Sequence, residues 1–420
     1  MLIKEREKIT KGITEVLKIM DRGSFVEIGA KACGKETSVY SPDAVCGSDG
    51  VVTGYGTVDG KAVFLFCQDE DVMGGTMGAV HAGKIRRIYS MAQKTGVPVI
   101  GIVNSRGFRI EEAADGLEAF GDLYREALKA KETVLQIIIK DTNSTGAMTA
   151  LAETADFTLE AGKQDNSKVV RQLLDILPPS KRIKQEPGEV KDDLNRLCID
   201  IEENGGNPME FLKEISDDGF VLEYKADMGM RTVTAFIRLA GRTVGAVMGI
   251  SGQDEASLMD AQAVEKAAQF VKLCSSLNIG ILTTGSNCGV GAEAAKEPRM
   301  IRAICELSAN LANANVPKIS LLAGEWAGLG YILMGSKAFA MDMVFAWPSA
   351  KVMMINSNQA VSVLYPGIRP PEVFEKAKEY EQRCCSIDFL LERGYADKAI
   401  APEESRKYLI GAFEAFNGAY

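Results

Sequence analysis

Two stretches of the chain decide its fold when one is laid over the other. Residues 134–159 read VLQIIIKDTNSTGAMTALAETADFTL, and residues 316–341 read VPKISLLAGEWAGLGYILMGSKAFAM. Each begins with a short apolar run, continues through a glycine, and ends in small and apolar residues. The shift of 182 residues places Gly146 over Gly328. The pattern predicts that a buried strand, a glycine turn and a helix occur twice.

The repeat extends upstream at the same shift. Residues 81–107 lie over residues 263–289, and the match ends with Phe157 over Phe339. It runs without a gap over about 80 residues, which is longer than coincidence between supersecondary units would produce. We therefore expect an internal duplication and two domains of one fold.

Helical and strand patterns alternate in both halves. Segments with helical spacing precede near-continuous runs of Val and Ile, which is typical of a parallel sheet covered by helices on both faces. We expect an α/β fold with right-handed crossovers. The N-terminal domain is predicted to cover residues 1–176 and the C-terminal domain residues 197–420. The charged, proline-containing stretch 177–196 is predicted to be the linker.

Composition excludes several classes of protein. The chain has 420 residues, of which 46% are hydrophobic and 25% charged, with a net charge of −9. No segment supplies the clustered Lys and Arg that bind nucleic acid, and no run approaches the about twenty apolar residues of a membrane span. The nine cysteines form no CxxC pair and no cluster with the single histidine, so no metal site is expected. Reduced thiols are typical of a cytoplasmic protein.

The glycine turns are the first candidate sites. In parallel α/β sheets, ligands bind beyond the carboxyl ends of the strands, where these turns lie. Backbone N–H groups at the start of a helix can hold an anion if small residues leave them accessible. Gly146 and Ala147 in the first half, and Gly328 and Gly330 in the second, meet that condition. Alternatively, these glycines only allow close packing, but their recurrence in both halves favours two anion sites.

Side chains for acid–base chemistry are scarce. His81 is the only histidine and is expected to serve packing or capping. No GxSxG or GxxxxGK[ST] motif occurs. The adjacent acids Glu111 and Glu112, and Asp217 and Asp218, have diverging side chains and are expected to be solvated. If the protein is an enzyme, we expect backbone N–H groups to stabilise an oxyanion while the base comes from elsewhere.

Short motifs in a fixed order run along the chain. They include RGSFVEIG (22–29), DGVVTGYGTVDGKAVFLFCQD (49–69), HAGKI (81–85), GVPVIGI (96–102), LPPSKR (177–182), DDGFVLE (217–223), LAGRTVGAV (239–247), MGSKAF (334–339), FAWPSA (345–350) and RGYADKAIAPEESR (393–406). In this order and spacing the chain resembles, over nearly its full length, the carboxyltransferase subunit of biotin-dependent acyl-CoA carboxylases and decarboxylases, of the propionyl-CoA carboxylase beta-chain type.

The resemblance implies a fold, a reaction and partners. The implied fold is two tandem crotonase-like domains, and the active site lies between the first domain of one subunit and the second domain of another. The implied reaction moves a carboxyl group between biotin and an acyl-CoA through backbone-stabilised enolates. Biotin is carried on a separate carrier protein. The implied partners are that carrier, biotin carboxylase or decarboxylase subunits, and further copies of the chain, in a dimer unit or a hexamer.

The resemblance also implies roles for particular residues. The first-domain pair, Gly146 and Ala147, would stabilise the thioester enolate. The second-domain pair, Leu329 and Gly330, would stabilise the ureido oxygen of biotin. The catalytic residues are then Gly146, Ala147, Leu329 and Gly330. The implied cofactor-binding residues are Ser105, Arg106, Gly107 and Gly328.

The motifs at these positions differ from the family pattern. Where the family has S-G-G-A-R-I, this chain has SRGFRI (105–110), which places Arg106 and Phe108 where small residues make room for ligand. The family's A-G-G-A is TGAM (145–148) in this chain, and the family's Y-G-G-A-Y is AGLGY (327–331). The chain also lacks a segment of roughly forty residues that, in the family, follows the first oxyanion site and helps to enclose the active site. It is therefore either a carboxyltransferase with a remodelled pocket or a degenerate paralogue that binds acyl-CoA or a partner subunit without turnover. The third hypothesis, a hydratase or isomerase, needs carboxylates beside the first oxyanion site.

Overall fold

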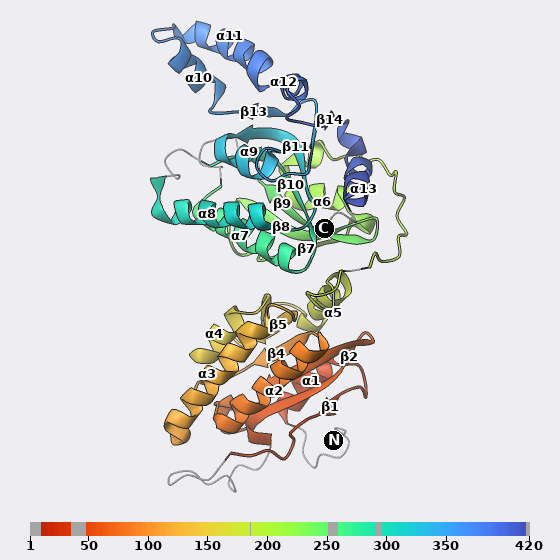
Figure 1. Cartoon of the computed structure of the whole chain (residues 1–420), viewed down its shortest axis with the longest axis vertical. Helices are drawn as coiled ribbons and strands as arrows, with labels where there is room; N and C mark the ends of the chain where they lie inside the picture. The colour runs from red at the N-terminus through yellow and green to blue at the C-terminus, as the bar shows by residue number, and fades with distance from the viewer. Residues whose placement is uncertain (1–9, 35–47, 185, 251–258, 291–295, 417–420) are drawn as a thin grey trace. The chain divides into compact units, whose positions relative to one another are not determined.

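The computed structural model describes residues 10–34, 48–184, 186–250, 259–290 and 296–416. The chain divides into two units, Met1–Lys184 and Gln185–Tyr420 (Figure 1). The division lies within the stretch predicted as linker, and both ends of that stretch are packed. Lys181 forms a buried ion pair with Asp156 of the first unit at 2.6 Å, and Asp192 pairs with Arg406 of the second at 3.4 Å.

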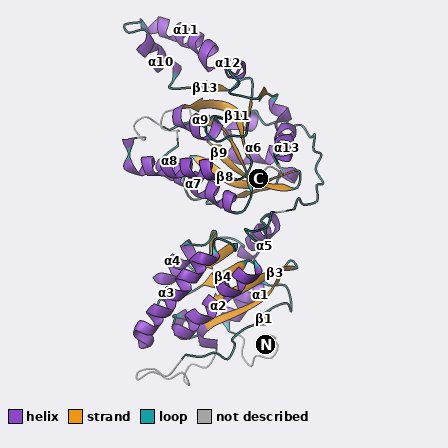
Figure 2. Ribbon diagram, in the orientation of Figure 1, coloured by secondary structure: helices purple, strands orange, loops and turns teal. Residues whose placement is uncertain are grey.

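The first unit is a mixed sheet with helices against it (Figure 2). In chain order its helices and strands are α1 (Lys11–Ile19), β1 (Val26–Glu27), β2 (Val51–Val58), β3 (Lys61–Gln68), α2 (Ala79–Thr95), β4 (Val99–Val103), α3 (Ala113–Ala130), β5 (Gln136–Lys140), α4 (Ala147–Glu153), β6 (Phe157–Glu160) and α5 (Asn166–Ile176).

The strands of this sheet are hydrogen-bonded in sequence order from β1 to β6. The steps from β3 to β6 are parallel, as predicted, but β1, β2 and β3 pair antiparallel. The cause is the tight turn between β2 and β3, where Asp59 and Gly60 have φ of 48° and 76°. A turn of two residues with positive φ has a backbone twist that matches the right-handed twist of the antiparallel strands it joins.

One apolar core lies between this sheet and helices α2, α3 and α4. Phe66, Val103 and Ile138, from β3, β4 and β5, are buried together with apolar residues of α2, α3 and α4. Helix α1 packs against β2 and β3, burying Ile13 and Val16, and α5 packs against α1. The sheet is therefore covered by helices, as the continuous apolar strands predict.

The second unit contains a longer series of elements. They are α6 (Pro208–Ile215), β7 (Val221–Glu223), β8 (Thr232–Leu239), β9 (Arg242–Gly249), α7 (Ala261–Ser276), β10 (Gly280–Cys288), α8 (Pro298–Asn313), β11 (Lys318–Ala327), α9 (Gly328–Gly335), β12 (Met343–Ala346), β13 (Lys351–Met353), α10 (Ser357–Leu364), α11 (Pro370–Tyr380), α12 (Ile387–Glu392), β14 (Lys398–Ala399) and α13 (Ser405–Ala415).

Its sheet repeats the topology of the first. The strand order is β7, β8, β9, β10, β11, β12, β14, with antiparallel pairing from β7 to β9 and parallel pairing from β9 onward, while β13 adds to the far end of β11. The hairpin turn again has two residues of positive φ, Ala240 and Gly241. Strands β4 and β5 correspond to β10 and β11 at a shift of 182, since Val99 pairs with Gln136 and the residues 182 further on, Ile281 and Lys318, also pair.

The last repeated strand breaks the ungapped match. Ile137 pairs with Phe157 in the first unit, but its counterpart Ile319 pairs with Met343 rather than with Phe339. Four additional residues therefore precede β12, and the prediction that Phe157 and Phe339 are equivalent is wrong. Phe339 lies in the turn before β12, where its amide donates to the Ser336 carbonyl at 3.3 Å. Within the described ranges, no helix is long and apolar enough to cross a membrane.

Candidate active site

The first glycine turn joins β5 to α4 at the carboxyl end of the sheet. It is tied to the end of β4: the Thr145 amide donates to the Ser105 carbonyl at 3.1 Å, and the Ser144 hydroxyl donates to the Val103 carbonyl at 3.0 Å. Gly146 has φ 66° and ψ −142°, a conformation open only to glycine without strain. A Cβ on Gly146 would meet no atom within 4 Å. Packing therefore does not explain this glycine, whereas its backbone conformation does.

The amides of this turn are available to a ligand. No side chain caps α4, and among the described residues neither the Gly146 nor the Ala147 N–H has an acceptor. Gly146 is exposed and Ala147 half-buried. Two neighbouring N–H groups without an acceptor among the described residues can hold one oxyanion.

The predicted residues 105–107 form the neighbouring loop, and they have different roles. Ser105 is fully buried, and its hydroxyl accepts from the Gly107 amide at 3.2 Å. The Arg106 amide donates to the Gly74 carbonyl at 3.3 Å, and the Arg106 side chain lies against Gly74, since a Cβ there would be 3.1 Å from Arg106 Cδ. Ser105 and Gly107 therefore shape the loop, and Arg106 alone of the three exposes its side chain.

Phe108 does not crowd this site as the sequence suggests. Its ring packs edge-on against Phe120 of α3, with centroids 5.6 Å apart, and it joins the rim of the core beneath the helices. The bulk of this residue is taken up between the loop and α3 rather than beside the Gly146 turn.

The second turn is built differently. Strand β11 continues to Ala327 and passes directly into α9, whose first residue, Gly328, has φ 48°. Leu329 is 37% exposed. Gly330 is buried, and a Cβ there would lie 2.6 Å from the Cys288 carbonyl oxygen at the end of β10. Close packing therefore explains Gly330, while Gly328 and Leu329 lie at the more open part of the turn.

Sequence reasoning missed a buried ion-pair network that holds the first site in place. Arg109 is buried, and its guanidinium donates to the carboxylates of Asp49 at 2.7 Å and Glu112 at 2.8 Å. Glu112 also accepts from the Ala79 amide at the start of α2 at 2.6 Å. The Arg109 amide donates to Met77, which fixes the loop carrying Ser105 to Gly107. The prediction that Glu112 is solvated is therefore wrong.

The second pair of acids departs from the prediction in the same way. Asp217 is 5% exposed and pairs with the buried Arg406 at 2.7 Å, while its neighbour Asp218 lies outside this contact. Lys84, from the HAGKI motif (81–85), is also buried, and its amine donates to the Ser48 carbonyl at 2.7 Å. In each case a charged side chain is stabilised by partners distant in sequence.

His81 is a packing histidine, as predicted. It is fully buried; Nδ1 lies 3.0 Å from the Asp49 carbonyl oxygen and Nε2 3.1 Å from Gln68 Nε2. Burial, together with the charge of Arg109, lowers the pKa of His81 to about 3. The ring is neutral and both nitrogens are engaged, so His81 cannot act as a base. In the described part of the chain, no group of three or more His, Cys, Asp or Glu is arranged to hold a metal ion.

Known proteins resemble this chain in sequence and in overall fold. The carboxyl transferase domain family matches residues 13–164 and 154–417. The propionyl-CoA carboxylase beta chain of Roseobacter denitrificans is 28% identical, over 94% of this chain and 88% of that protein. Methylmalonyl-CoA decarboxylase subunit alpha of Propionigenium modestum is 28% identical, over 95% and 89%. The hexameric transcarboxylase 12S, solved with methylmalonyl-coenzyme A and methylmalonic acid bound, matches with a TM-score of 0.89 at 26% identity, over 97% of this chain and 90% of that chain.

Two units of one topology, each with a glycine turn after its third parallel strand, define a protein of tandem crotonase-like domains. This confirms the predicted fold class. The chain belongs to the carboxyl transferase domain family, and within it to the propionyl-CoA carboxylase beta-chain type of carboxyltransferase subunit.

Proposed function

We propose that this chain moves a carboxyl group between biotin and an acyl-CoA. The observation that carries the proposal is the exposed Gly146–Ala147 turn, whose two N–H groups have no acceptor among the described residues, in a chain of the carboxyl transferase family. An acyl-CoA thioester oxygen that gains negative charge during the reaction is the kind of group these amides stabilise.

The contribution of the chain to the reaction is electrostatic. The amides of Gly146 and Ala147 donate to the thioester oxygen as it becomes an enolate oxygen, and one such donor typically contributes about 3 kcal/mol to the transition state. Biotin, when bound, supplies the carboxyl group and accepts the α-proton of the acyl group. His81 takes no part, since both of its ring nitrogens are engaged in the core.

The second turn is assigned to biotin. Leu329 is partly exposed at the start of α9, and its N–H would hold the ureido oxygen together with the adjoining amide of Gly330. The Leu329 side chain does not remove this donor, but it narrows the approach to it. Arg106, whose exposed side chain lies against Gly74, is assigned to coenzyme A, while Ser105 and Gly107 keep the loop in shape.

We further propose that the chain works within a larger assembly. The relatives named above are subunits of multi-subunit enzymes, and the structural match is a hexamer. A biotin carboxyl carrier and a biotin carboxylase or decarboxylase subunit are the partners that the reaction requires. The chain itself is expected to form homo-oligomers, in which the first unit of one copy faces the second unit of another.

Calorimetry with several CoA esters tests the proposal, using the full chain and free coenzyme A as the reference. We expect saturable binding of short-chain acyl-CoA esters and biotin-dependent turnover of at least one. Binding without any turnover would instead identify a degenerate paralogue. Absence of binding to every ester would contradict both and leave a structural subunit.

A further inference from the structure

Beyond the sheet, the chain that leaves β4 and the chain that leaves β5 continue side by side toward the first glycine turn. The Asp141 amide donates to the Val103 carbonyl at 2.9 Å. The next backbone bond between the two chains runs from the Thr145 amide to the Ser105 carbonyl at 3.1 Å. Residues 142–144 lie between these two bonds, so the backbone pairing is interrupted just before the turn.

The hydroxyl of Ser144 fills this interruption. It donates to the Val103 carbonyl at 3.0 Å and accepts from the Ser105 amide at 3.4 Å. Ser105 is fully buried, and its amide has no other acceptor in the described part of the chain. The Ser144 side chain therefore takes the place of a backbone bond between the two chains and satisfies a buried donor.

The backbone of Ser144 is held as well. Its amide donates to the Asp141 carbonyl at 3.1 Å. Its carbonyl accepts from the hydroxyl of Thr149, a residue of α4, at 3.2 Å. Ser144 thus connects the end of β4, the glycine turn and the helix that follows it.

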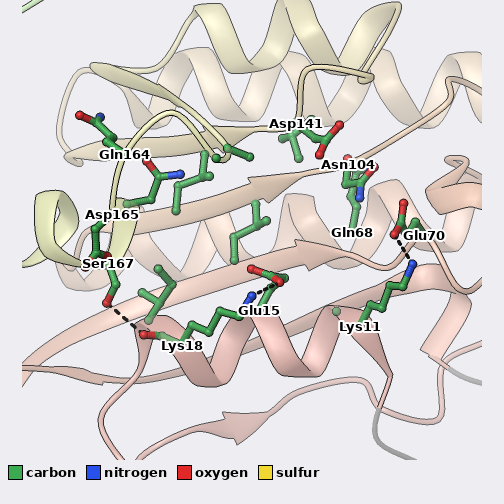
Figure 3. A pocket seen from close by; sticks show the side chains of 18 residues that line it. Lys11, Glu15, Lys18, Gln68, Glu70, Asn104, Asp141, Gln164, Asp165 and Ser167 are labelled. Carbon is green, nitrogen blue, oxygen red and sulfur yellow. Dashed lines mark hydrogen bonds and ion pairs between the residues drawn. The ribbon is translucent and has the colours of Figure 1, made fainter.

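Packing contributes little to the position of this turn. Gly146 is exposed, and a Cβ there would meet no atom within 4 Å. Asn104 and Asp141, at the ends of the two strands, line a cavity of about 560 Å³ (Figure 3). Hydrogen bonds therefore decide where the Gly146 and Ala147 amides point, and the Ser144 hydroxyl makes two of these bonds.

We propose that Ser144 is a positioning residue for the oxyanion site. Its hydroxyl holds the turn against the end of β4, so that the Gly146 and Ala147 amides stay where they donate to the thioester oxygen. This inference rests on the proposed carboxyl transfer at the turn. The amides act most strongly on the enolate, so their misplacement lowers kcat more than it raises KM.

Ser144→Ala and Ser144→Thr test this role through turnover of a CoA ester that the wild-type chain accepts. Removing the hydroxyl should lower kcat about tenfold and change KM by less than about twofold, because the two amide donors are displaced but not removed. Ser144→Thr keeps a hydroxyl and should recover most of kcat. A wild-type kcat in Ser144→Ala, or no recovery in Ser144→Thr, would overturn the proposal.

Ser24→Ala is the matched control. The Ser24 hydroxyl donates to the Asp21 carbonyl at 2.9 Å and accepts from the Thr57 amide at 3.1 Å, so it also joins two backbone segments of the first unit. Thr57 lies in β2 beside the amino end of β3, away from the carboxyl ends of the parallel strands. Ser24→Ala should lower the denaturant midpoint about as much as Ser144→Ala and leave kcat unchanged. An equal fall of kcat in both variants would reduce Ser144 to a structural role and overturn the proposal.

Hydrogen exchange on the full chain separates this inference from the proposed reaction. The Ser105 and Thr145 amides should exchange about tenfold faster in Ser144→Ala than in the wild-type chain, and at the wild-type rate in Ser24→Ala. If the wild-type chain had no turnover, the proposed function would fail, while faster exchange in Ser144→Ala would still support the positioning of the turn by Ser144. Unchanged exchange in Ser144→Ala would overturn that role whether or not the chain turns over.

Discussion

Replacing Gly146 with alanine isolates the contribution of the first turn. The new Cβ meets no atom within 4 Å, so steric overlap contributes nothing to the cost. The cost lies in the backbone, because φ 66° with ψ −142° is a conformation that L-residues avoid, at about 1–3 kcal/mol. The turn either keeps this strain, with a methyl group in front of the amides, or relaxes and turns the amides away.

Both outcomes reduce oxyanion stabilisation. We expect Gly146→Ala to lower the stability of the first unit by about 1–3 kcal/mol in denaturant unfolding. Turnover should fall about a hundredfold, the effect of losing one donor worth about 3 kcal/mol. CoA-ester affinity, measured by calorimetry, should also fall.

The chain offers a matched control for this substitution. Gly121 lies inside α3, is exposed, and likewise has no atom within 4 Å of an added Cβ, but its backbone is helical. Gly121→Ala should therefore stabilise α3, by about 1 kcal/mol, and leave turnover unchanged. If Gly146→Ala kept wild-type turnover and affinity, or if Gly121→Ala lost them equally, the turn would not be the oxyanion site.

Four further predictions follow from single residues. Leu329→Gly should leave CoA-ester affinity in calorimetry unchanged, because the second turn is assigned to biotin. Gly330→Ala, which brings a Cβ to 2.6 Å from the Cys288 carbonyl, should lower stability in denaturant by about 1–3 kcal/mol. Arg109→Met should cost about 3–5 kcal/mol in the same assay, because it leaves two buried carboxylates unpaired. The pKa of His81 is about 3 in the folded chain, against an ordinary 6.5. Between these two pH values the unfolded chain binds more protons, so the free energy of unfolding rises with pH by at most about 1.4 kcal/mol per pH unit from this residue. His81→Gln should flatten that rise when unfolding is measured between pH 3 and pH 6.5.

Local signals in the sequence were sufficient for the repeated architecture. Gly146 and Gly328 follow apolar runs that predict buried strands, and the structure places both at strand-to-helix junctions. The antiparallel hairpin was also readable, since Asp59–Gly60 is a strong signal for a two-residue turn. The ungapped match failed at β12 because an insertion in a turn can align one phenylalanine with another by chance.

The supporting contacts of the site could not be predicted in this way. Arg109 is buried with Asp49, sixty residues earlier in the chain, and with Glu112 on the next turn. A single sequence contains no signal for such a pairing, because burial of a charge is decided by tertiary contacts rather than by its neighbours. The same holds for Gln68, whose side-chain amide contacts the buried ring of His81. Which residues of the repeated turns contact a ligand stays a prediction.

The central claim, carboxyl transfer at the Gly146 turn, is tested most directly by decarboxylation of malonyl-CoA and methylmalonyl-CoA with and without free biotin. The measurement compares the wild-type chain, Gly146→Ala and Gly121→Ala by following the decarboxylated CoA ester. We predict biotin-dependent turnover in the wild-type chain and in Gly121→Ala, and about a hundredfold less in Gly146→Ala. Turnover that is absent in the wild-type chain, independent of biotin, or equal in all three proteins would contradict it.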